Sequence, residues 1–75
     1  MIDKMFVFNE YLINIRNIDY VKMGMFERKK TSQIYTKVYW FGIYFMQDVI
    51  QFEYETKEER DKAHKILLNT IYSVI

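Results

Sequence analysis

The 75-residue sequence contains no cysteine, no proline, two glycines and a single histidine. Without cysteine, neither a disulfide nor a cysteine-ligated zinc ion can stabilise the fold, and nothing marks an oxidising compartment. No glycine- or proline-rich stretch provides a linker, and a chain of this length suffices for one small core. We therefore expect a single small domain over residues 1–75.

Long apolar runs are also missing. No stretch of about 18 uncharged apolar residues occurs, and no basic segment precedes a long apolar one, so neither a membrane span nor a secretion signal is predicted. We expect a cytoplasmic protein that does not enter a membrane. The 11 basic and 10 acidic residues leave a net charge of +1, which gives no global electrostatic reason for binding nucleic acid.

Groups that could carry catalytic chemistry are scarce. His64 is the one histidine, and Ser32 and Ser73 are the only serines. A nucleophile, a base and an acid would have to be assembled from a loop and a helix. No glycine-rich phosphate loop is present either. We expect a protein that is not an enzyme, with no catalytic residues, no metal and no cofactor.

What the chain does contain is apolar and aromatic side chains, at 51% and 19% of the residues, which predicts a packed core. A short N-terminal strand and a reversal are expected before a second strand that begins near Ile18. Residues 34–46 and 49–55 are further β-favouring stretches. The polar residues 27–33 predict a hairpin loop, and Gln47 and Asp48 a two-residue turn.

The C-terminal residues change from an alternating pattern to a helical period. Thr56 and Glu59 have the spacing of a capping box, which predicts where the helix begins. The predicted apolar stripe consists of Ala63, Ile66, Leu67, Ile71 and Val74, and the predicted water-facing residues are Arg60, Lys62, Lys65 and Asn69. The expected fold is α+β, a four-stranded antiparallel meander with one C-terminal helix packed on one face (ββββα).

The predicted turn also decides which side chains share a face of the sheet. It pairs Met46 with Val49 and Phe45 with Ile50, and the core side then carries Phe41, Ile43, Phe45, Ile50, Phe52 and Tyr54. With only one helix available, nothing in this plan covers the opposite side. That side is the candidate interaction face, Val38, Trp40, Tyr44, Met46 and Val49.

Two structural alternatives stay open at this point. The first strand and residues 11–18 could fold back over the candidate interaction face. In the second strand, the register is not fixed by the sequence. Either Val21, Met23 and Met25 face the core while Ile18 and Tyr20 join the outer side, or the reverse holds.

The leading functional interpretation is a non-enzymatic protein-interaction domain that forms a homodimer through this face. A twofold interface uses one patch twice and adds burial that so small a core lacks. The first alternative is an inhibitor or adaptor, encoded by a phage or mobile element, that docks the same face on a larger protein.

The second alternative is single-stranded nucleic-acid binding. Trp40 and Tyr44 would offer stacking platforms, and the possible basic contact loop consists of Arg28, Lys29 and Lys30. Acidic side chains at Glu53 and Glu55 on the same face would repel phosphate, which disfavours this interpretation.

The stretch IYFMQDVIQFEYETKEERDKAHKIL, residues 43–67, resembles the strand–turn–strand–helix ending of many small proteins of bacteria and their phages. More loosely, it is similar to the last strands and helix of pleckstrin-homology-like domains. The resemblance covers about a third of the chain and includes no residue with a defined role. A complete domain of that kind would not fit into 75 residues, so the resemblance implies no more than a bacterial or phage accessory protein.

Overall fold

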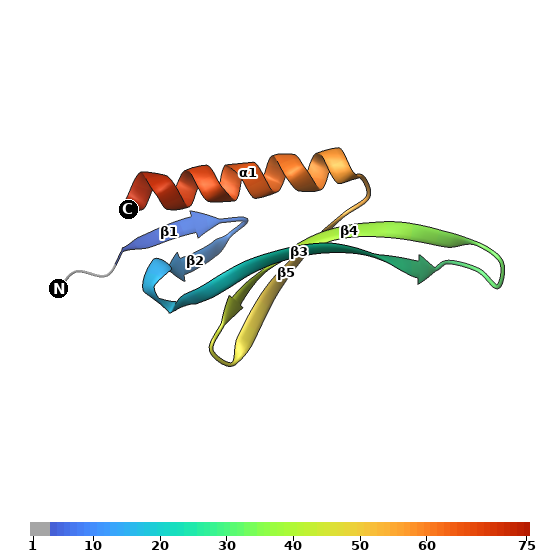
Figure 1. Cartoon of the computed structure of the whole chain (residues 1–75), viewed down its shortest axis with the longest axis horizontal. Coiled ribbons are helices and arrows are strands. Elements are labelled where there is room, and N and C mark those ends of the chain that lie inside the picture. The colour runs from blue at the N-terminus through green and yellow to red at the C-terminus, as the bar shows by residue number, and fades with distance from the viewer. Residues whose placement is uncertain (1–3) are drawn as a thin grey trace.

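Residues 4–75 are described by the computed structural model, in which five strands precede one helix (Figure 1). The elements are β1 (Met5–Phe8), β2 (Tyr11–Asn14), a short 3₁₀ turn η1 (Ile15–Asn17), β3 (Ile18–Lys29), β4 (Tyr35–Phe45), β5 (Asp48–Tyr54) and α1 (Lys57–Val74). Within these residues the strands form two antiparallel sheets, β1-β2 and β3-β4-β5. The predicted α+β class with one C-terminal helix is confirmed, but the predicted single four-stranded meander is wrong.

The N-terminal segment forms its own hairpin because the chain reverses after a four-residue strand. Asn9 and Glu10 make the turn with φ angles of 45° and 71°, and two consecutive positive φ values are typical of the turn that closes a two-residue hairpin. After β2, the Asn14 side chain accepts a hydrogen bond from the Arg16 N–H at 3.0 Å, which begins η1 and redirects the chain. β3 therefore begins at Ile18, as predicted, but belongs to a different sheet from β1.

The β4-β5 hairpin has the predicted faces but not the predicted register. Phe41 pairs with Phe52 and Phe45 with Asp48, so the turn is formed by Met46 and Gln47 rather than by Gln47 and Asp48. The Asp48 carboxylate accepts a hydrogen bond from the Val49 N–H at 2.8 Å, at the first residues of β5. The register differs from the predicted one by two residues, and because side chains alternate with a period of two, the residues that stay in the two strands keep their predicted faces.

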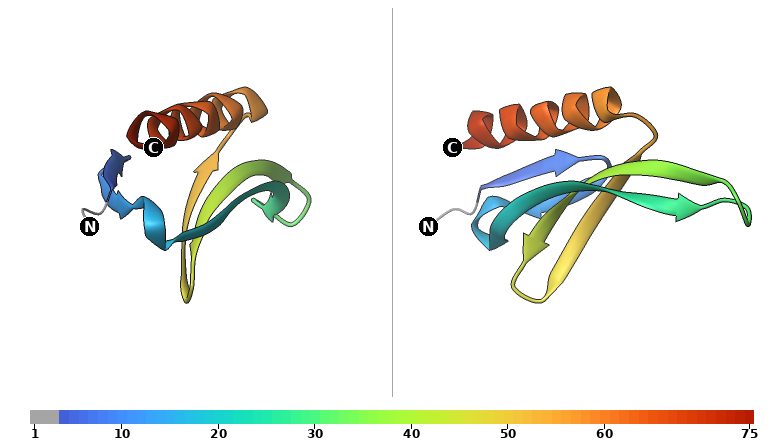
Figure 2. Two further views of the ribbon diagram at one scale, coloured as in Figure 1. Left: turned by 60° about the vertical axis from the view of Figure 1, so that its left-hand side comes forward. Right: turned by 45° about the vertical axis from the view of Figure 1, so that its right-hand side comes forward.

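The helix and the β1-β2 hairpin pack on the same face of the three-stranded sheet, which we call the inner face (Figures 1 and 2). The opposite, outer face has neither element on it. The buried apolar residues of the inner face come from both sheets and from the helix, and they are Phe6, Phe8, Ile13, Phe41, Ile43 and Leu67.

Phe41 lies at the centre of this core and is completely buried. Its ring centroid is 5.3 Å from that of Phe52, 5.7 Å from Tyr54, 6.0 Å from Phe8 and 5.6 Å from His64. One side chain of β4 therefore contacts the N-terminal hairpin, β5 and the helix, and aromatic contacts of this kind add to the free energy of burial.

The helix begins where the capping pattern predicts. The Thr56 hydroxyl accepts a hydrogen bond from the Glu59 N–H at 3.1 Å. Its apolar stripe is rotated from the predicted one, since Ile66 is half exposed whereas Arg60, predicted to face water, is 7% exposed. The residues that pack on the core are Ala63, Leu67, Ile71 and Val74, and Arg60 lies on the same side because steps of three and four residues return to one helix face.

The Tyr54 hydroxyl is buried and makes no hydrogen bond of standard geometry within residues 4–75. Burial raises the pKa of Tyr54 above its ordinary value of 10.0, and the nearby Asn9 side chain offsets part of that rise. A buried hydroxyl without a partner costs free energy, so we expect Tyr54→Phe to increase the stability by about 1 kcal/mol at neutral pH, as measured by urea unfolding.

Tyr54→Phe should also change how the stability of the fold depends on pH in the alkaline range. Because the folded-state pKa is raised, the protonated phenol favours the folded state below pH 10.0, and that contribution is lost as the pH rises through the folded pKa. The gain from Tyr54→Phe should therefore grow above pH 10.0. An equal difference between the two proteins at neutral and alkaline pH would contradict this account.

The molecule is elongated, with extents of 55 × 26 × 18 Å and a radius of gyration of 14.5 Å. A compact chain of this length has a radius of gyration of about 11 Å. The difference comes from the β3-β4 hairpin, which continues beyond the end of β5 (Figure 1). We call this projecting part, residues 26–38, the arm. In the part of the chain that is described, no helix is long and apolar enough to cross a membrane.

Candidate interaction surface

Side chains on the outer face are arranged in rows that cross the three strands. Paired residues of adjacent antiparallel strands point to the same face, so the register determines the rows. From the β4-β5 turn toward the arm, they are Tyr20, Tyr44 and Val49; then Lys22, Gly42 and Gln51; then Gly24, Trp40 and Glu53; and finally Phe26 with Val38.

The five predicted interaction residues differ widely in their exposure. Val38 is 9% exposed, and Trp40 and Tyr44 are half-buried. Val49 is 43% exposed and lies on the outer face, whereas Met46, at 86%, is in the turn and not on the strand where it was predicted. The structure therefore does not bring the five together as one flat apolar patch.

The two glycines explain why the large aromatic side chains are partly covered. A Cβ atom placed on Gly24 would lie 2.9 Å from Cζ2 of Trp40, and one on Gly42 would lie 3.1 Å from Cε2 of Tyr44. Each ring therefore lies over the backbone of a glycine instead of standing up into solvent. Trp40 covers a glycine on the neighbouring strand β3, as aromatic side chains commonly do, whereas Tyr44 covers a glycine of its own strand.

The exposed apolar side chains of the outer-face rows lie in the row nearest the β4-β5 turn. The rings of Tyr20 and Tyr44 are stacked, with centroids 4.6 Å apart and an interplanar angle of 12°. Val49 follows Tyr44 in the same row, and Tyr20 is 55% exposed. We call Tyr20, Tyr44 and Val49 the tyrosine row.

The sequence left open whether Ile18 and Tyr20 lie on the outer side of β3. The structure places Tyr20 there but not Ile18, and a bulge explains the difference. Ile18 pairs with Phe45 and Tyr20 with Tyr44, so Asp19 is an extra residue in β3. A bulge of this kind changes the alternation, and Ile18 packs against the core while Tyr20 joins the outer face. Val21, Met23 and Met25 lie on the inner side of β3.

The predicted basic loop is only partly a loop. Arg28 and Lys29 lie in β3, and Lys30 alone belongs to the connection at the tip of the arm. The Arg28 guanidinium forms an ion pair with the Glu53 carboxylate at 3.0 Å and lies 5.3 Å from the centre of the Phe26 ring. Its charge is therefore already opposed by a carboxylate on the same face.

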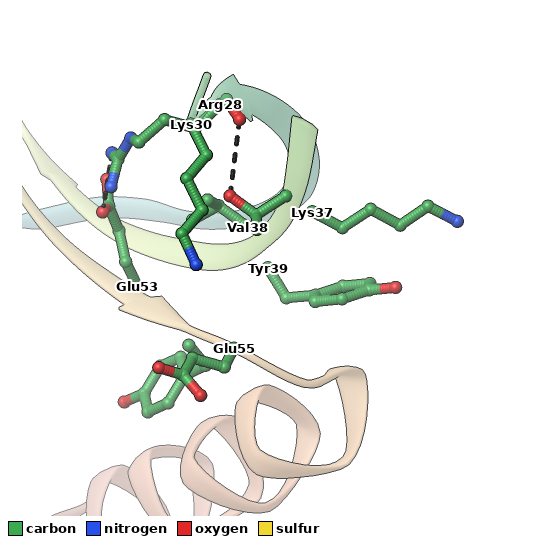
Figure 3. A pocket seen from close by; sticks show the side chains of 9 residues that line it. Arg28, Lys30, Lys37, Val38, Tyr39, Glu53 and Glu55 are labelled. Atoms are coloured by element: carbon green, nitrogen blue, oxygen red, sulfur yellow. Dashed lines mark hydrogen bonds and ion pairs between the residues drawn. The ribbon is translucent and has the colours of Figure 1, made fainter. Parts of the chain in front are cut away.

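A shallow groove of about 740 Å³ lies where β5 leaves the sheet, at the base of the arm. Figure 3 shows Arg28 beside Glu53 on one side of β4, while Lys37 and Tyr39 point the other way. With Lys30 and Glu55 also lining it, the groove carries both signs of charge. This mixture does not single out an anion or a cation as a ligand.

His64 and the carboxylates are the side chains to consider for catalysis or metal binding. His64, the one histidine, is half-buried with its ring packed at 66° to that of Phe41. Residues 4–75 contain no group of three or more histidine, aspartate or glutamate side chains arranged to hold a metal ion.

Comparison with known proteins does not add a family to these observations. No family model matches the chain. No curated protein and no solved structure shows significant similarity to it. The function must therefore be argued from the geometry of the chain itself.

Proposed function

We propose that this chain is a small non-enzymatic protein-interaction domain that associates with a second copy of itself through the outer face. The observation that carries the proposal is that both elements able to cover the sheet, the helix and the β1-β2 hairpin, lie on the inner face (Figure 2). The outer face therefore presents the tyrosine row to solvent, and uncovered apolar side chains in such an arrangement are typical of interaction sites.

The small size of the core supports association. A single core in a chain of this length gives only a few kcal/mol of net stability. Large apolar side chains that stay exposed include Tyr20 at 55%, Val49 at 43% and Met46 at 86%. A twofold interface through the outer face would bury Tyr20 and Val49 in both copies and add to the stability of both.

Docking of the same face on a different protein is the alternative that the elongated shape favours. The arm projects away from the core and provides an extended strand pair that a larger partner could engage. Nucleic-acid binding is not proposed, because the Arg28 charge is paired with Glu53 and a second carboxylate, Glu55, lines the same groove.

The test measures the solution mass by light scattering after size exclusion, over a concentration series, for the native chain and Val49→Glu. Val49 is exposed, so the variant should keep the native circular dichroism spectrum. We expect a native dimer and a folded monomeric variant, because a buried unpaired carboxylate opposes association. Tyr72→Glu, on the helix and 71% exposed, is the matched control and should stay dimeric. A native monomer at every concentration would contradict self-association.

A further inference from the structure

β3 is a 12-residue strand at the edge of the three-stranded sheet, and no described residue pairs with its free side. Long uncovered edge strands are templates for pairing with another chain, and proteins usually shorten, cover or interrupt them. Here the strand contains no proline, and its bulge lies at its first residues, so the rest of the edge is uninterrupted.

The backbone groups that point to the free edge can be identified. The Lys30 N–H donates to the Ile34 carbonyl at 2.8 Å, which makes this a hydrogen-bonded pair of the β3-β4 hairpin. The register is regular from there to Tyr20, and hydrogen-bonded pairs recur at every second residue. From Tyr20 to Lys29, even-numbered residues of β3 therefore bond to β4, and odd-numbered residues present their N–H and C=O groups to the open edge.

The arm gives a physical reason for the edge to be occupied. Pairing between β4 and β5 ends at Tyr39 and Tyr54, so in the arm β3 and β4 have only each other. A two-stranded ribbon is marginally stable in water. A third strand beside the arm would satisfy its free backbone groups and support it.

We infer that the occupant is β3 of a second copy, paired antiparallel about a twofold axis at Gly24. In this register Met23 of one copy lies opposite Met25 of the other, and Val21 lies opposite Glu27. Asp19 lies opposite Lys29, so an attractive charge pair forms at each end of the interface. The odd-numbered residues from Val21 to Glu27 meet as hydrogen-bonded pairs, as the free backbone groups require.

The charged side chains favour this register over the registers shifted by two residues. Shifting the copies by two residues in one direction places Asp19 opposite Glu27, and shifting them in the other direction places Lys22 opposite Arg28. Like charges directly opposite each other destabilise a strand pair. In the inferred register no like charges face each other, and Tyr20 lies opposite Arg28, a pair suited to a cation–π contact.

The remaining charged residues fit the same arrangement. Lys22 would lie opposite Phe26, and long charged side chains can cover an apolar neighbour while keeping the charge in water. On the inner side, Met23 and Met25, 38% and 48% exposed in the single chain, would form one cluster with their symmetry mates. Methionine adapts well to such contacts.

This inference rests on the proposed self-association but assigns the contact between the two copies to the edge of β3, as an alternative to the outer face. Pairing at β3 would join two three-stranded sheets into one six-stranded sheet, with both outer faces on the same side. The edge and the outer face can be tested independently, because Val49 lies on β5, at the opposite side of the sheet from β3.

A charge exchange in the full chain tests the register. Asp19 and Lys29 are both exposed, so their variants should fold normally. We expect Asp19→Lys and Lys29→Asp each to raise the dimer dissociation constant about tenfold in sedimentation equilibrium, because two attractive pairs per dimer become repulsive. The double variant, Asp19→Lys with Lys29→Asp, should restore the native value.

Proline substitutions test the backbone pairing. Met25→Pro removes an N–H that points to the free edge of β3 and should abolish the dimer. Gln51→Pro, at the free edge of β5, removes an equivalent N–H and should leave the dimer intact. Circular dichroism spectra show whether each variant is folded. If Met25→Pro is unfolded, the charge exchange alone tests the pairing at the edge of β3.

The outcomes separate this inference from the outer-face proposal. A dimer that the β3 variants weaken and the double variant restores supports edge pairing, whatever Val49→Glu does. A dimer broken by Val49→Glu but insensitive to every β3 variant overturns edge pairing and keeps the outer-face proposal. A double variant as weak as the single ones overturns the register, and a native monomer overturns both proposals.

Discussion

Phe41→Ala is expected to unfold the domain or to leave it barely folded. The side chain is completely buried and contacts rings from the N-terminal hairpin, from β5 and from the helix. Truncating a buried phenylalanine costs about 3–5 kcal/mol, which is comparable with the whole net stability of a domain of this size. Urea unfolding followed by circular dichroism, with the native chain measured in parallel, gives the difference.

The matched control is Tyr72→Ala, another aromatic truncation at a site that is 71% exposed. We expect a change of less than about 0.5 kcal/mol there, as for other surface substitutions. If Phe41→Ala were to keep a cooperative transition with a loss below about 1 kcal/mol, the three contacts could not be holding the two sheets and the helix together.

The central part of this core was predictable from local patterns. Alternation along residues 41–45 and 50–54 assigns Phe41, Ile43 and Phe52 to one face, and this assignment survives a register error of two residues because the faces repeat with the same period. The helix start was predictable for a similar reason, since the contact from Thr56 to the Glu59 N–H depends only on neighbouring residues.

The separate N-terminal sheet was not predictable from those patterns. Its turn places Glu10 at a φ of 71°, a conformation that glutamate rarely adopts, so the turn residues themselves gave a weak indication of where the chain reverses. The packing of Phe6 and Phe8 beside the helix depends on contacts with residues that are far away in the sequence. Alternation shows that such a strand has an apolar face but does not show which surface that face will contact.

The candidate interaction surface was predictable in its position but not in its exposure. Alternation correctly places Trp40 and Tyr44 on the side away from the helix. How far each ring is covered depends on the residue opposite or beside it, and here that residue is Gly24 or Gly42. The bulge at Asp19, which brings Tyr20 beside Tyr44, has no glycine or proline to mark it in the sequence.

Arg60→Ala is expected to destabilise the fold by about 2–3 kcal/mol, although the helical pattern places this residue among those facing water. The guanidinium donates to the Gly24 carbonyl at 2.9 Å and lies 5.5 Å from the centre of the Tyr39 ring. Its side chain is nearly buried, with Asp61 at 3.0 Å as its counter-ion. Truncation would remove a charged hydrogen bond together with the apolar contacts of the side chain.

Two further variants distinguish this link from a general effect of removing charge from the helix. Lys62→Ala removes an exposed cation two residues away and should change the stability by less than about 0.5 kcal/mol. Asp61→Asn should cost less than Arg60→Ala, because the amide oxygen of asparagine can still accept a hydrogen bond from the guanidinium. Equal losses for Arg60→Ala and Lys62→Ala would contradict the role of Arg60. A much larger loss for Arg60→Ala would mean that this single side chain ties the first turns of α1 to β3, and hence the helix to the strand with the open edge.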